Sequence, residues 1–348
     1  MTASSSTRLP PPDPVTILCD ARRLGVYSLI FGPQGTVHEM SLFSGHEEGL
    51  IIEWSLVRNR PECSWNAHGG TVLWMDIRSM DGNCFLFSQG RDGTIKVWSC
   101  SCGLWTPQVE VPSASMLFCN SSLAVTMDKF TLAAPSEQQA TVDLHHICSS
   151  EKSRPLSVSY HHFLRPDSET EYGMCMKMQF CPAEVEEGVS KCPLRLLVGY
   201  ESGQIVLWDA DQAVQLSLLQ VFEEPVMCLT VWCATVNSRR VARGCCGSTS
   251  TELKSFCVGV DTITTDKSVS VTNAGFSDVC CREDAKIFAT GGWDNAGRVF
   301  SAKTLRPLVV LTYHQKGIGA VTFSQNNNLA LGCRGGYITI WDVYKNTG

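Results

Sequence analysis

The sequence has no apolar run long enough to cross a membrane, and its N-terminus lacks the basic-then-apolar layout of a signal peptide. It has no excess of basic residues either, since its formal net charge is −6 at pH 7. We therefore expect neither a membrane association nor general binding to nucleic acid, because both usually require a basic surface. The 18 cysteines are then expected to lie in a reducing compartment as thiols.

Motifs of the common catalytic and cofactor sites are missing as well. No Gly-x-Ser-x-Gly run offers a nucleophile elbow, and the glycine-rich stretch 244–249 lacks the lysine of a phosphate-binding loop. Paired glutamates occur only in stretches that we interpret as loops, at no spacing typical of acid–base catalysis. We therefore expect no enzyme, no cofactor and no catalytic residue.

One set of metal-capable side chains needs a separate assessment, because its members lie close together in the sequence. The set is His145, His146, Cys148, His161, His162, Cys175 and Cys181. No Cys-x-x-Cys pair occurs in the sequence, although such pairs support many structural zinc sites. We favour polar loop residues of an irregular repeat over a zinc site, and expect no bound metal.

A short hairpin that recurs along the chain organises the sequence. In its clearest copy Ser88 ends one strand, the Arg-Asp-Gly triplet 91–93 forms a tight turn, and residues 94–98 alternate polar and apolar side chains. The aspartate can bond its own backbone two residues on, and the glycine accepts a positive φ. The run ends on Trp98, which we interpret as the anchor of one repeat.

The other copies keep the same spacing. The anchors are Trp54, Trp98, Trp208, Phe256, Phe300 and Trp341. Five of the six have a glycine nine residues before them, and four have a glycine five residues before them; Asn295 takes the second place in one copy. Neighbouring anchors lie 41–48 residues apart, except for a gap of 110 between Trp98 and Trp208 that holds one degenerate unit and an insertion. A period of about 40–45 residues with a Trp-Asp ending is typical of a four-stranded propeller blade.

On these repeats the chain resembles the WD-repeat family, whose members fold as β-propellers. We expect an all-β protein in which residues 14–348 form a single domain of seven blades, after a disordered Ser-, Thr- and Pro-rich tail over residues 1–13. The last repeat ends on its third strand. We therefore expect residues 14–19 to supply the missing outer strand of the last blade, which closes the ring and removes an open edge.

Three repeats look irregular. For the third we expect strands at 115–119, at 123–126 or 130–133, at 141–145 and at 156–160, followed by a polar linker over 165–172. In the fourth, residues 182–193 bulge out as an insertion. In the fifth, a Thr- and Asp-rich insertion over 259–267 leads to an outer strand at 268–272.

The second repeat contains His68, Ser88, Asp92 and Trp98, which match the internal hydrogen-bonded tetrad of the WD-repeat family. In such blades the histidine bridges the serine hydroxyl and the turn aspartate, and the serine reaches the tryptophan N–H. Buried polar groups must be paired in this way or each destabilises the fold by about 1–3 kcal/mol. A hydrolase triad is the alternative for these residues, but their spacing is the structural one, so we interpret them as scaffold.

The residue seven positions before each anchor falls in the hairpin turn, on one rim of the ring beside the central channel. These residues are Glu47, Arg91, Glu201, Trp293 and Arg334, and in the copy that ends on Phe256 we assign Ser250, one residue later, to this turn. Charged side chains are ordinary in a solvated turn, whereas an exposed tryptophan is costly unless it packs or binds. Packing remains one interpretation of Trp293. We predict that Arg91, Trp293 and Arg334, with Glu47 and Glu201, form a partner-binding rim.

Residues 87–92, 223–227 and 289–300 resemble those of the G-protein β-subunit-like protein 1 group, also called the ASTRA-associated protein 1 group. The resemblance implies a non-catalytic scaffold that binds co-chaperone subunits and phosphatidylinositol-3-kinase-related kinases, and so supports kinase maturation and stability. It also implies a monomeric propeller within a larger complex, in cytoplasm and nucleus. Two alternatives stay open: a G-protein β-like signalling scaffold, although no long N-terminal heptad helix is present to pair with a γ subunit, and a ubiquitin-ligase substrate receptor.

Overall fold

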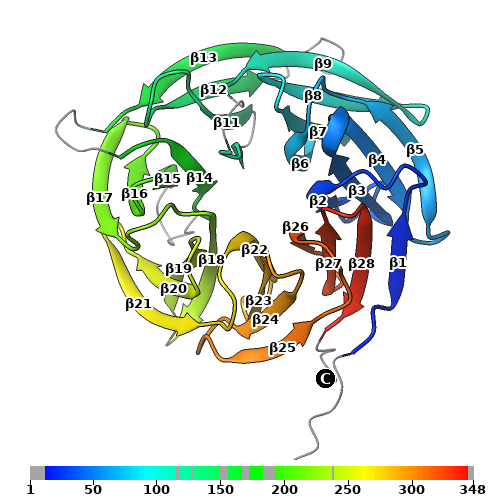
Figure 1. Ribbon diagram of the computed structural model, residues 1–348. Helices are drawn as coiled ribbons and strands as arrows, with labels where there is room; N and C mark the ends of the chain where they lie inside the picture. Colours follow the sequence, from blue (N-terminus) through cyan, green and yellow to red (C-terminus); the bar gives the residue numbers. More distant parts are fainter. Residues whose placement is uncertain are drawn as a thin grey trace, which may run out of the picture.

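A computed structural model describes residues 12–80, 82–114, 118–126, 129–148, 156–166, 172–182, 193–236 and 239–343. Its strands form seven four-stranded antiparallel sheets, arranged as blades around a common centre (Figure 1). The predicted all-β, seven-bladed propeller is confirmed. Within the described part of the chain, no helix is long and apolar enough to span a membrane.

The first three blades follow the chain in order. Blade 1 consists of β2 (Val26–Phe31), β3 (Ser41–His46), β4 (Leu50–Ser55) and β5 (Arg60–Asn66), with a 3₁₀ turn over Glu47–Gly49. Blade 2 consists of β6 (Val72–Met80), β7 (Asn83–Gly90), β8 (Thr94–Ser101) and β9 (Leu104–Pro112). Blade 3 consists of β10 (Ser122–Val125), β11 (Lys129–Pro135), β12 (Val142–Cys148) and β13 (Ser157–Leu164).

The next three blades repeat the pattern, and the seventh combines both ends of the chain. Blade 4 consists of β14 (Cys175–Phe180), β15 (Arg195–Tyr200), β16 (Gln204–Asp209) and β17 (Val214–Gln220). Blade 5 consists of β18 (Cys228–Val236), β19 (Arg239–Gly247), β20 (Glu252–Val258) and β21 (Ile263–Ser270). Blade 6 consists of β22 (Phe276–Cys281), β23 (Ile287–Gly292), β24 (Gly297–Ser301) and β25 (Pro307–Leu311). Blade 7 consists of β26 (Ile318–Phe323), β27 (Asn328–Cys333), β28 (Tyr337–Asp342) and β1 (Thr16–Cys19).

Blade 7 closes the ring as predicted. β1 pairs antiparallel with β28, with Thr16 opposite Ile340 and Cys19 opposite Tyr337. Leu18 of β1 is buried in the same hydrophobic cluster as Ile340. In Figure 1 the blue β1 therefore lies beside the red β28. Because the outer strand comes from the other end of the chain, separating this blade would require breaking the strand pairing of β1 with β28.

The hairpin turns have the backbone geometry that the sequence predicts. Gly93 in the turn before β8 has φ = +84°, and Asn295 at the matching place before β24 has φ = +68°. Only glycine, and next to it asparagine, adopts this left-handed region at small cost. The spacing between turn and anchor therefore recurs among the repeats because one turn residue must adopt a positive φ.

Five of the six anchors lie where the third strand changes register against the outer strand. In blade 2 the pairing of β8 with β9 shifts between Val97 and Trp98. The same shift comes directly before Trp54, Trp208, Phe256 and Phe300. All six predicted anchors are at most 5% exposed. A bulge of this kind re-aims the following side chain, here into the core.

In blade 3 the same shift falls between Leu144 and His145, so His145 occupies the anchor position. Its side chain is buried, and its ring meets the edge of Tyr160 at a centroid distance of 5.6 Å. The strand predicted at 141–145 places His145 correctly, but our interpretation of the metal-capable set as loop residues was wrong. His146 and Cys148 also lie within β12, His161 and His162 within β13, and Cys175 within β14. A repeat without an aromatic anchor nevertheless keeps the blade geometry.

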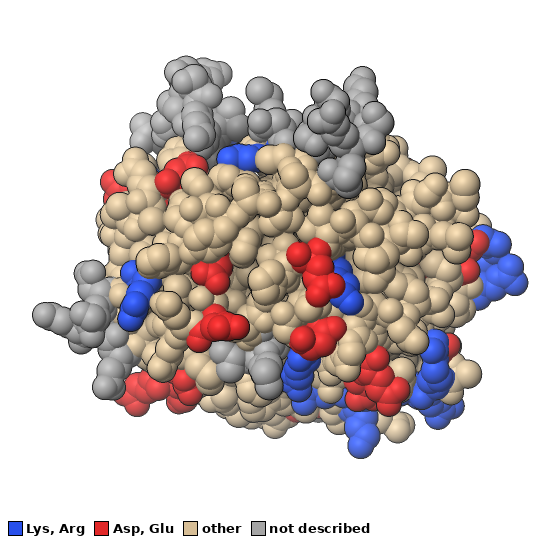
Figure 2. Space-filling view, turned by 90° about the horizontal axis from the view of Figure 1, so that it is seen from above, with Lys and Arg blue, Asp and Glu red and all other residues tan. Residues whose placement is uncertain are grey.

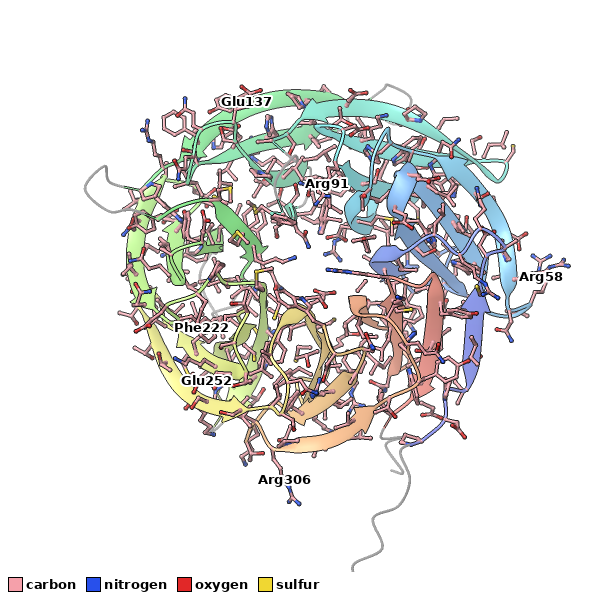
Figure 3. The ribbon with its side chains drawn as sticks, in the orientation of Figure 1. Arg58, Arg91, Glu137, Phe222, Glu252 and Arg306 are labelled. Carbon is pink, nitrogen blue, oxygen red and sulfur yellow. The ribbon has the colours of Figure 1, made fainter. Side chains whose placement is uncertain are left out.

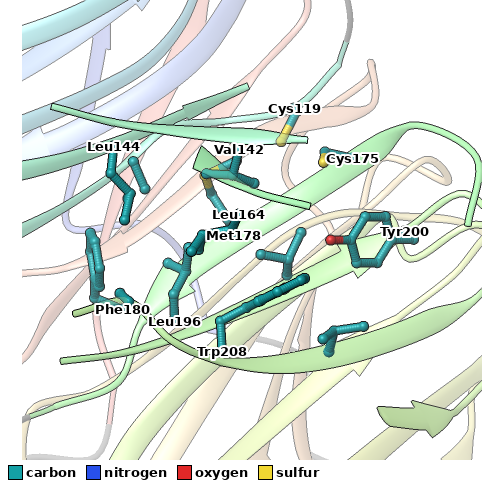
Figure 4. Close-up of a cluster of buried hydrophobic side chains, with 14 of the residues drawn as sticks. Cys119, Val142, Leu144, Leu164, Cys175, Met178, Phe180, Leu196, Tyr200 and Trp208 are labelled. Carbon is teal, nitrogen blue, oxygen red and sulfur yellow. The ribbon is translucent and has the colours of Figure 1, made fainter. Parts of the chain in front are cut away.

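The hydrophobic core is divided among the junctions between neighbouring blades. Figure 4 shows one such cluster, in which Val142 and Leu144 of blade 3 pack with Phe180, Leu196 and Trp208 of blade 4. Burying a Leu, Phe or Val side chain stabilises the fold by about 1.5–3 kcal/mol relative to leaving it exposed. Each blade is therefore stabilised by its two neighbours, and the closed ring leaves no blade without one.

The prediction for the start of blade 3 was wrong. The first strand is β10 (Ser122–Val125) rather than 115–119, and the second is β11, as in the 130–133 alternative; residues 115–117 lie outside the described residues. The buried Gln89 of blade 2 explains the shift. Its side-chain amide donates to Cys119 O (3.0 Å) and accepts from Ser121 N (2.8 Å), so these backbone groups bond a side chain instead of a neighbouring strand.

The prediction for the outer strand of blade 5 was also wrong. β21 covers Ile263–Ser270, so most of the Thr- and Asp-rich stretch 259–267 is strand and not an insertion. A short turn, closed by Gly259 N donating to Thr262 O at 2.8 Å, leads into it. Because an outer strand is exposed over most of its length, its composition resembles that of a loop. The predicted insertion at 182–193 lies outside the described residues, except for its two end residues.

Candidate interaction surface

The predicted tetrad in blade 2 forms a continuous chain of hydrogen bonds. His68 Nδ1 lies 3.1 Å from Asp92 Oδ1, and His68 Nε2 lies 2.8 Å from Ser88 Oγ. Trp98 Nε1 donates to the same Ser88 oxygen at 2.8 Å. The Asp92 carboxylate also accepts from Gly69 N at 2.8 Å, which ties the chain segment before β6 to the hairpin turn.

The environment of these groups favours a structural role. Burial lowers the pKa of His68 below its ordinary value, against the opposing effect of the Asp92 carboxylate. Burial alone would raise the pKa of Asp92, but the hydrogen bond from Gly69 and the nearby imidazole lower it. Ser88 is fully buried and its oxygen already bonds both neighbours. No substrate carbonyl can approach this hydroxyl, so the arrangement cannot act as a nucleophile–base pair.

Two further chains of this type exist that the sequence analysis did not predict. In blade 1, Ser44 Oγ lies 2.7 Å from His46 Nε2 and accepts from Trp54 Nε1 at 2.7 Å. In blade 7, Thr339 Oγ1 lies 2.8 Å from His314 Nε2 and accepts from Trp341 Nε1 at 2.8 Å. Ser44 keeps the ten-residue offset of Ser88 from its tryptophan, which was a usable signal. Thr339 precedes its tryptophan by two residues on the same strand, so no common spacing covers it.

Among the five rim residues, Trp293 has one face of its ring packed against the protein and much of its remaining surface exposed to solvent. One face of its indole lies against the backbone of Gly275, where an added Cβ would come within 2.3 Å of the ring. The side chain nevertheless keeps 42% of its surface exposed. The turn that carries it is rigid, because Asp294 accepts from Arg298 Nη1 at 3.0 Å and from Asn273 Nδ2 at 2.8 Å. Trp293 is therefore a fixed apolar surface on the rim.

Arg91 and Arg334 line the same cavity as Trp293. This cavity has a volume of about 420 Å³ and is formed by residues of all seven blades or the segments that lead into them, at the centre of the ring. Figure 3 places Arg91 on the inner side of the ring, whereas Arg58 and Arg306 lie at its outer edge. The structure thus brings together three of the predicted rim residues, which are as far apart as 91 and 334 in the sequence.

Glu47 and Glu201 have a different surrounding. Glu47 Oε1 accepts from Gly25 N at 2.9 Å, and Glu201 Oε2 accepts from Met174 N at 3.1 Å. In both cases the carboxylate fixes the backbone just before the first strand of its own blade. Neither residue lines the central cavity. Their proposed contact with a partner stays a prediction, and their present hydrogen bonds explain them as turn residues.

The cavity also contains residues that the sequence analysis missed. Lys177 lies on β14 and Asp278 on β22, the innermost strands of blades 4 and 6. Phe118 and Tyr27 lie at the cavity as well. The available signal was a charged residue inside a first strand, such as Lys177 between the buried Met176 and Met178. Such a residue must point to a polar space, and in a propeller that space is the channel.

The histidines of blade 3 do not converge as metal ligands. The rings of His146 and His161 stack at 4.1 Å and those of His161 and His162 lie 4.0 Å apart, while Lys129 Nζ approaches His146 to 3.2 Å. His162 Nε2 donates to Ala210 O at 2.8 Å. Burial and the nearby Lys129 lower the pKa of His146 to about 4. Among the described residues no group of three ligands is placed to hold a metal ion, and no disulfide joins the described cysteines.

The closed ring of seven four-stranded blades, with Ser–His–Trp or Thr–His–Trp chains inside three of them, defines a WD-repeat propeller. The family model for the WD domain, G-beta repeat, matches residues 59–99 and 305–342. Each matched segment begins just before or at the outer strand of one blade, β5 or β25, and runs through the third strand of the next. They cover the three inner strands of blades 2 and 7, both of which carry a tryptophan anchor with its hydrogen-bonded hydroxyl.

Curated relatives match nearly the whole chain. The chain is 32% identical to guanine nucleotide-binding protein subunit beta-like protein 1 of Mus musculus, over 96% of this chain and 97% of that protein. It is 26% identical to ASTRA-associated protein 1 of Schizosaccharomyces pombe, over 87% of this chain and 93% of that protein. It is 25% identical to ASTRA-associated protein 1 of Aspergillus niger, over 92% of this chain and 83% of that protein. The chain belongs to the family of guanine nucleotide-binding protein subunit beta-like protein 1.

Proposed function

We propose that this protein is a non-catalytic scaffold of an ASTRA-type assembly, in which it holds co-chaperone subunits against phosphatidylinositol-3-kinase-related kinases while these kinases mature. The names of its fungal relatives support membership of such an assembly. Its fold supports a role in protein–protein contact, because WD-repeat propellers present rigid turns around a ring. The proposal also places it in the cytoplasm and nucleus, as a monomeric propeller within a larger complex.

The single observation that carries the proposal is the grouping of Arg91, Trp293 and Arg334 at one cavity. Tryptophan and arginine are the residue types that most often dominate the energy of protein interfaces. Trp293 is rigid and open, and both arginines are exposed on turns of different blades. A surface of this composition needs no catalytic group to act, and the tetrad of blade 2 is buried away from it.

A double variant tests the proposal. Trp293→Ala with Arg91→Ala should keep the thermal melt of the wild type, because both side chains lie on an exposed rim. It should lose most of the co-chaperone subunits that co-purify with the tagged wild-type protein, as measured by quantitative mass spectrometry. In cells depleted of the endogenous protein, the variant should fail to restore the levels of phosphatidylinositol-3-kinase-related kinases.

The matched control is Arg58→Ala with Arg306→Ala, which removes two arginines from the outer edge of the ring (Figure 3). It should retain partners and kinase levels. If the rim variant fully restores kinase levels in depleted cells, partners bind at another surface of the protein. Recovery of a G-protein γ subunit or of ubiquitin-ligase subunits, in place of co-chaperones, would contradict the proposal and support one of the two alternative scaffolds.

A further inference from the structure

The central cavity has a net positive charge although the whole chain carries −6. Its charged lining consists of Arg91, Lys177 and Arg334, against the single carboxylate of Asp278. Within the described part of the chain, none of these three cations forms an ion pair or a side-chain hydrogen bond. Figure 2, which looks onto the outer edge that carries β9 and β13, shows acidic and basic residues scattered among others, with no broad basic face. The cavity thus differs in charge from the outer edge seen in this view.

The two arginines are held by aromatic rings and not by anions. Arg91 Cζ lies 5.4 Å from the centre of the Phe118 ring, and Arg334 Cζ lies 5.8 Å from the centre of the Tyr27 ring. A guanidinium packed on a ring keeps its N–H groups available along its edge, and these bind a carboxylate in a bidentate way. Both side chains are thus oriented by the protein while their donors remain free.

The carboxylate of Asp278 is already occupied. Its Oδ2 accepts from Val321 N at 2.8 Å and its Oδ1 from its neighbour Val279 N at 3.0 Å. Burial raises the pKa of Asp278, although the positive charge of Lys177 opposes the shift. Asp278 therefore links the first strands of blades 6 and 7, and its single charge offsets at most one of the three cations.

Apolar surface adjoins the cations. Phe118 is 59% exposed and Trp293 is 42% exposed at the same cavity. Large apolar side chains that remain this open beside a cavity are unusual unless a partner covers them. A volume of about 420 Å³ lies within the range of about 300–1,000 Å³ that ligand sites span, and exceeds the need of a single small anion.

We infer that this cavity binds an acidic linear segment of a partner protein, with Asp or Glu carboxylates on Arg91, Lys177 and Arg334 and an apolar side chain against Trp293 and Phe118. The inference names the chemistry of the partner and so rests on the scaffold function proposed above. Charge complementarity selects the acidic segment, and the exposed aromatic rings distinguish it from a free inorganic anion, which would leave them uncovered. Three cations in a concave site are too few and too enclosed to follow a nucleic-acid backbone.

Binding of two fluorescent peptides to the purified full chain tests the inference. One peptide has the sequence Gly-Glu-Asp-Phe-Glu-Asp-Gly, and the other replaces each Glu by Gln and each Asp by Asn. The acidic peptide should bind in fluorescence anisotropy and weaken with added salt, while the neutral one should bind at least about tenfold more weakly, the loss expected for one or more charge-assisted hydrogen bonds. Arg91→Gln and Arg334→Gln should each weaken the acidic peptide by about tenfold.

Three controls decide among the outcomes. Arg306→Gln removes an equal charge at the outer edge and should leave binding unchanged, whereas Asp278→Asn keeps an acceptor for Val321 N and should tighten it. Equal weakening by Arg306→Gln would show non-specific attraction and overturn the inference. Competition by inorganic pyrophosphate as strong as by the unlabelled acidic peptide would overturn it in favour of a small-anion site.

The outcomes of the two proposals can be separated. If the wild-type chain recovers co-chaperone subunits from cells but binds neither peptide, the scaffold function stands and the acidic-segment inference fails. If the acidic peptide binds with the expected variant pattern while no co-chaperone subunit is recovered, the cavity chemistry stands and the assigned assembly is wrong.

Discussion

Blades 2 and 3 have the same architecture and different interiors. In blade 2 the third strand shifts its register against the outer strand directly before Trp98, which donates to Ser88 Oγ at 2.8 Å. In blade 3 the register shift stands at the same place, but His145 follows it. Ala134, which pairs with Asp143 as Ser88 pairs with Lys96, offers no hydroxyl. The geometry of a blade therefore does not depend on the polar chain.

What blade 3 keeps is its apolar contact with both neighbours. Leu132 and Ile147 pack with Phe87 and Val97 of blade 2, and Val142 and Leu144 pack with residues of blade 4. Strand pairing and burial between blades are sufficient to place the blade, since neighbours on both sides fix its position in the ring. The tetrad of blade 2 adds stability and a defined turn to a geometry that already exists.

The largest effect should come from breaking the anchor of blade 2. Trp98→Ala removes a buried aromatic and leaves Ser88 without one of its two hydrogen-bond partners in the tetrad. We expect a loss of about 3–5 kcal/mol in the free energy of unfolding, and in cells a loss of soluble protein, because the closed ring unfolds cooperatively. Urea unfolding of the purified variant measures it. A melt equal to that of the wild type would show that Trp98 is not a core anchor.

A smaller effect is expected from pH, because the junction between blades 1 and 2 contains a buried carboxylate and the junction between blades 3 and 4 is linked by a neutral hydrogen bond. Between blades 1 and 2, the buried Glu53 accepts from Ser41 Oγ (2.8 Å) and Trp105 Nε1 (2.9 Å), and lies 2.8 Å from His38 Nδ1. Burial opposes ionisation, but these hydrogen bonds outweigh it and lower the pKa of Glu53 to about 2. Between blades 3 and 4 the corresponding cross-blade bond is neutral, from Phe180 N to Ser122 Oγ at 2.9 Å.

A carboxyl with a lowered pKa stabilises the fold fully above its ordinary value and loses this contribution as the pH falls toward its folded value. Glu53 should therefore stabilise the protein at neutral pH and lose that contribution between about pH 4.5 and 2, by about 1–2 kcal/mol after allowance for solvent screening. Unfolding curves of Glu53→Gln and wild type should converge over this range. A constant difference between them down to pH 2 would contradict the assignment.

The smallest effect is expected at the anchor position of blade 3. His145→Ala removes a smaller ring whose main neighbour is Tyr160, so we expect a loss of about 1 kcal/mol in the free energy of unfolding. This variant and Trp98→Ala should be measured under the same conditions. The comparison shows whether the two anchor positions contribute differently to the free energy of unfolding. Equal losses would mean that the position, and not the tryptophan with its hydrogen bonds, carries the stability.

The same comparison explains how much of the molecule the sequence could predict. The blade count, the anchors and the closing strand β1 follow from a repeated spacing, because a positive φ at Gly93 and a buried ring at Trp98 constrain residue types directly. The anchor of blade 3 could not be found, since His145 has neither the aromatic type nor the glycine spacing. The outer strand β21 was misplaced because it is exposed over most of its length, so no alternation marks it.

Some residues of the candidate site could also be predicted from the sequence, and others could not. The turn residues Arg91, Trp293 and Arg334 were predictable from their offset to the anchors, and ring closure then brings them to one cavity. Lys177 and Asp278 carry no motif, and their meeting in the channel depends on the packing of first strands from blades 4 and 6. The aromatic partners Phe118 and Tyr27 of the two arginines also come from segments without a repeated spacing.

We propose that the cavity rim at Trp293 is the surface that holds partners. Site-specific photo-crosslinking in cells tests it most directly, with a photoreactive phenylalanine analogue placed at position 293 and, as the control, at position 306 on the outer edge of blade 6. We expect that position 293 crosslinks to a co-chaperone subunit or to a phosphatidylinositol-3-kinase-related kinase, and that position 306 does not. Crosslinks to these proteins from position 306, with none from position 293, would contradict it.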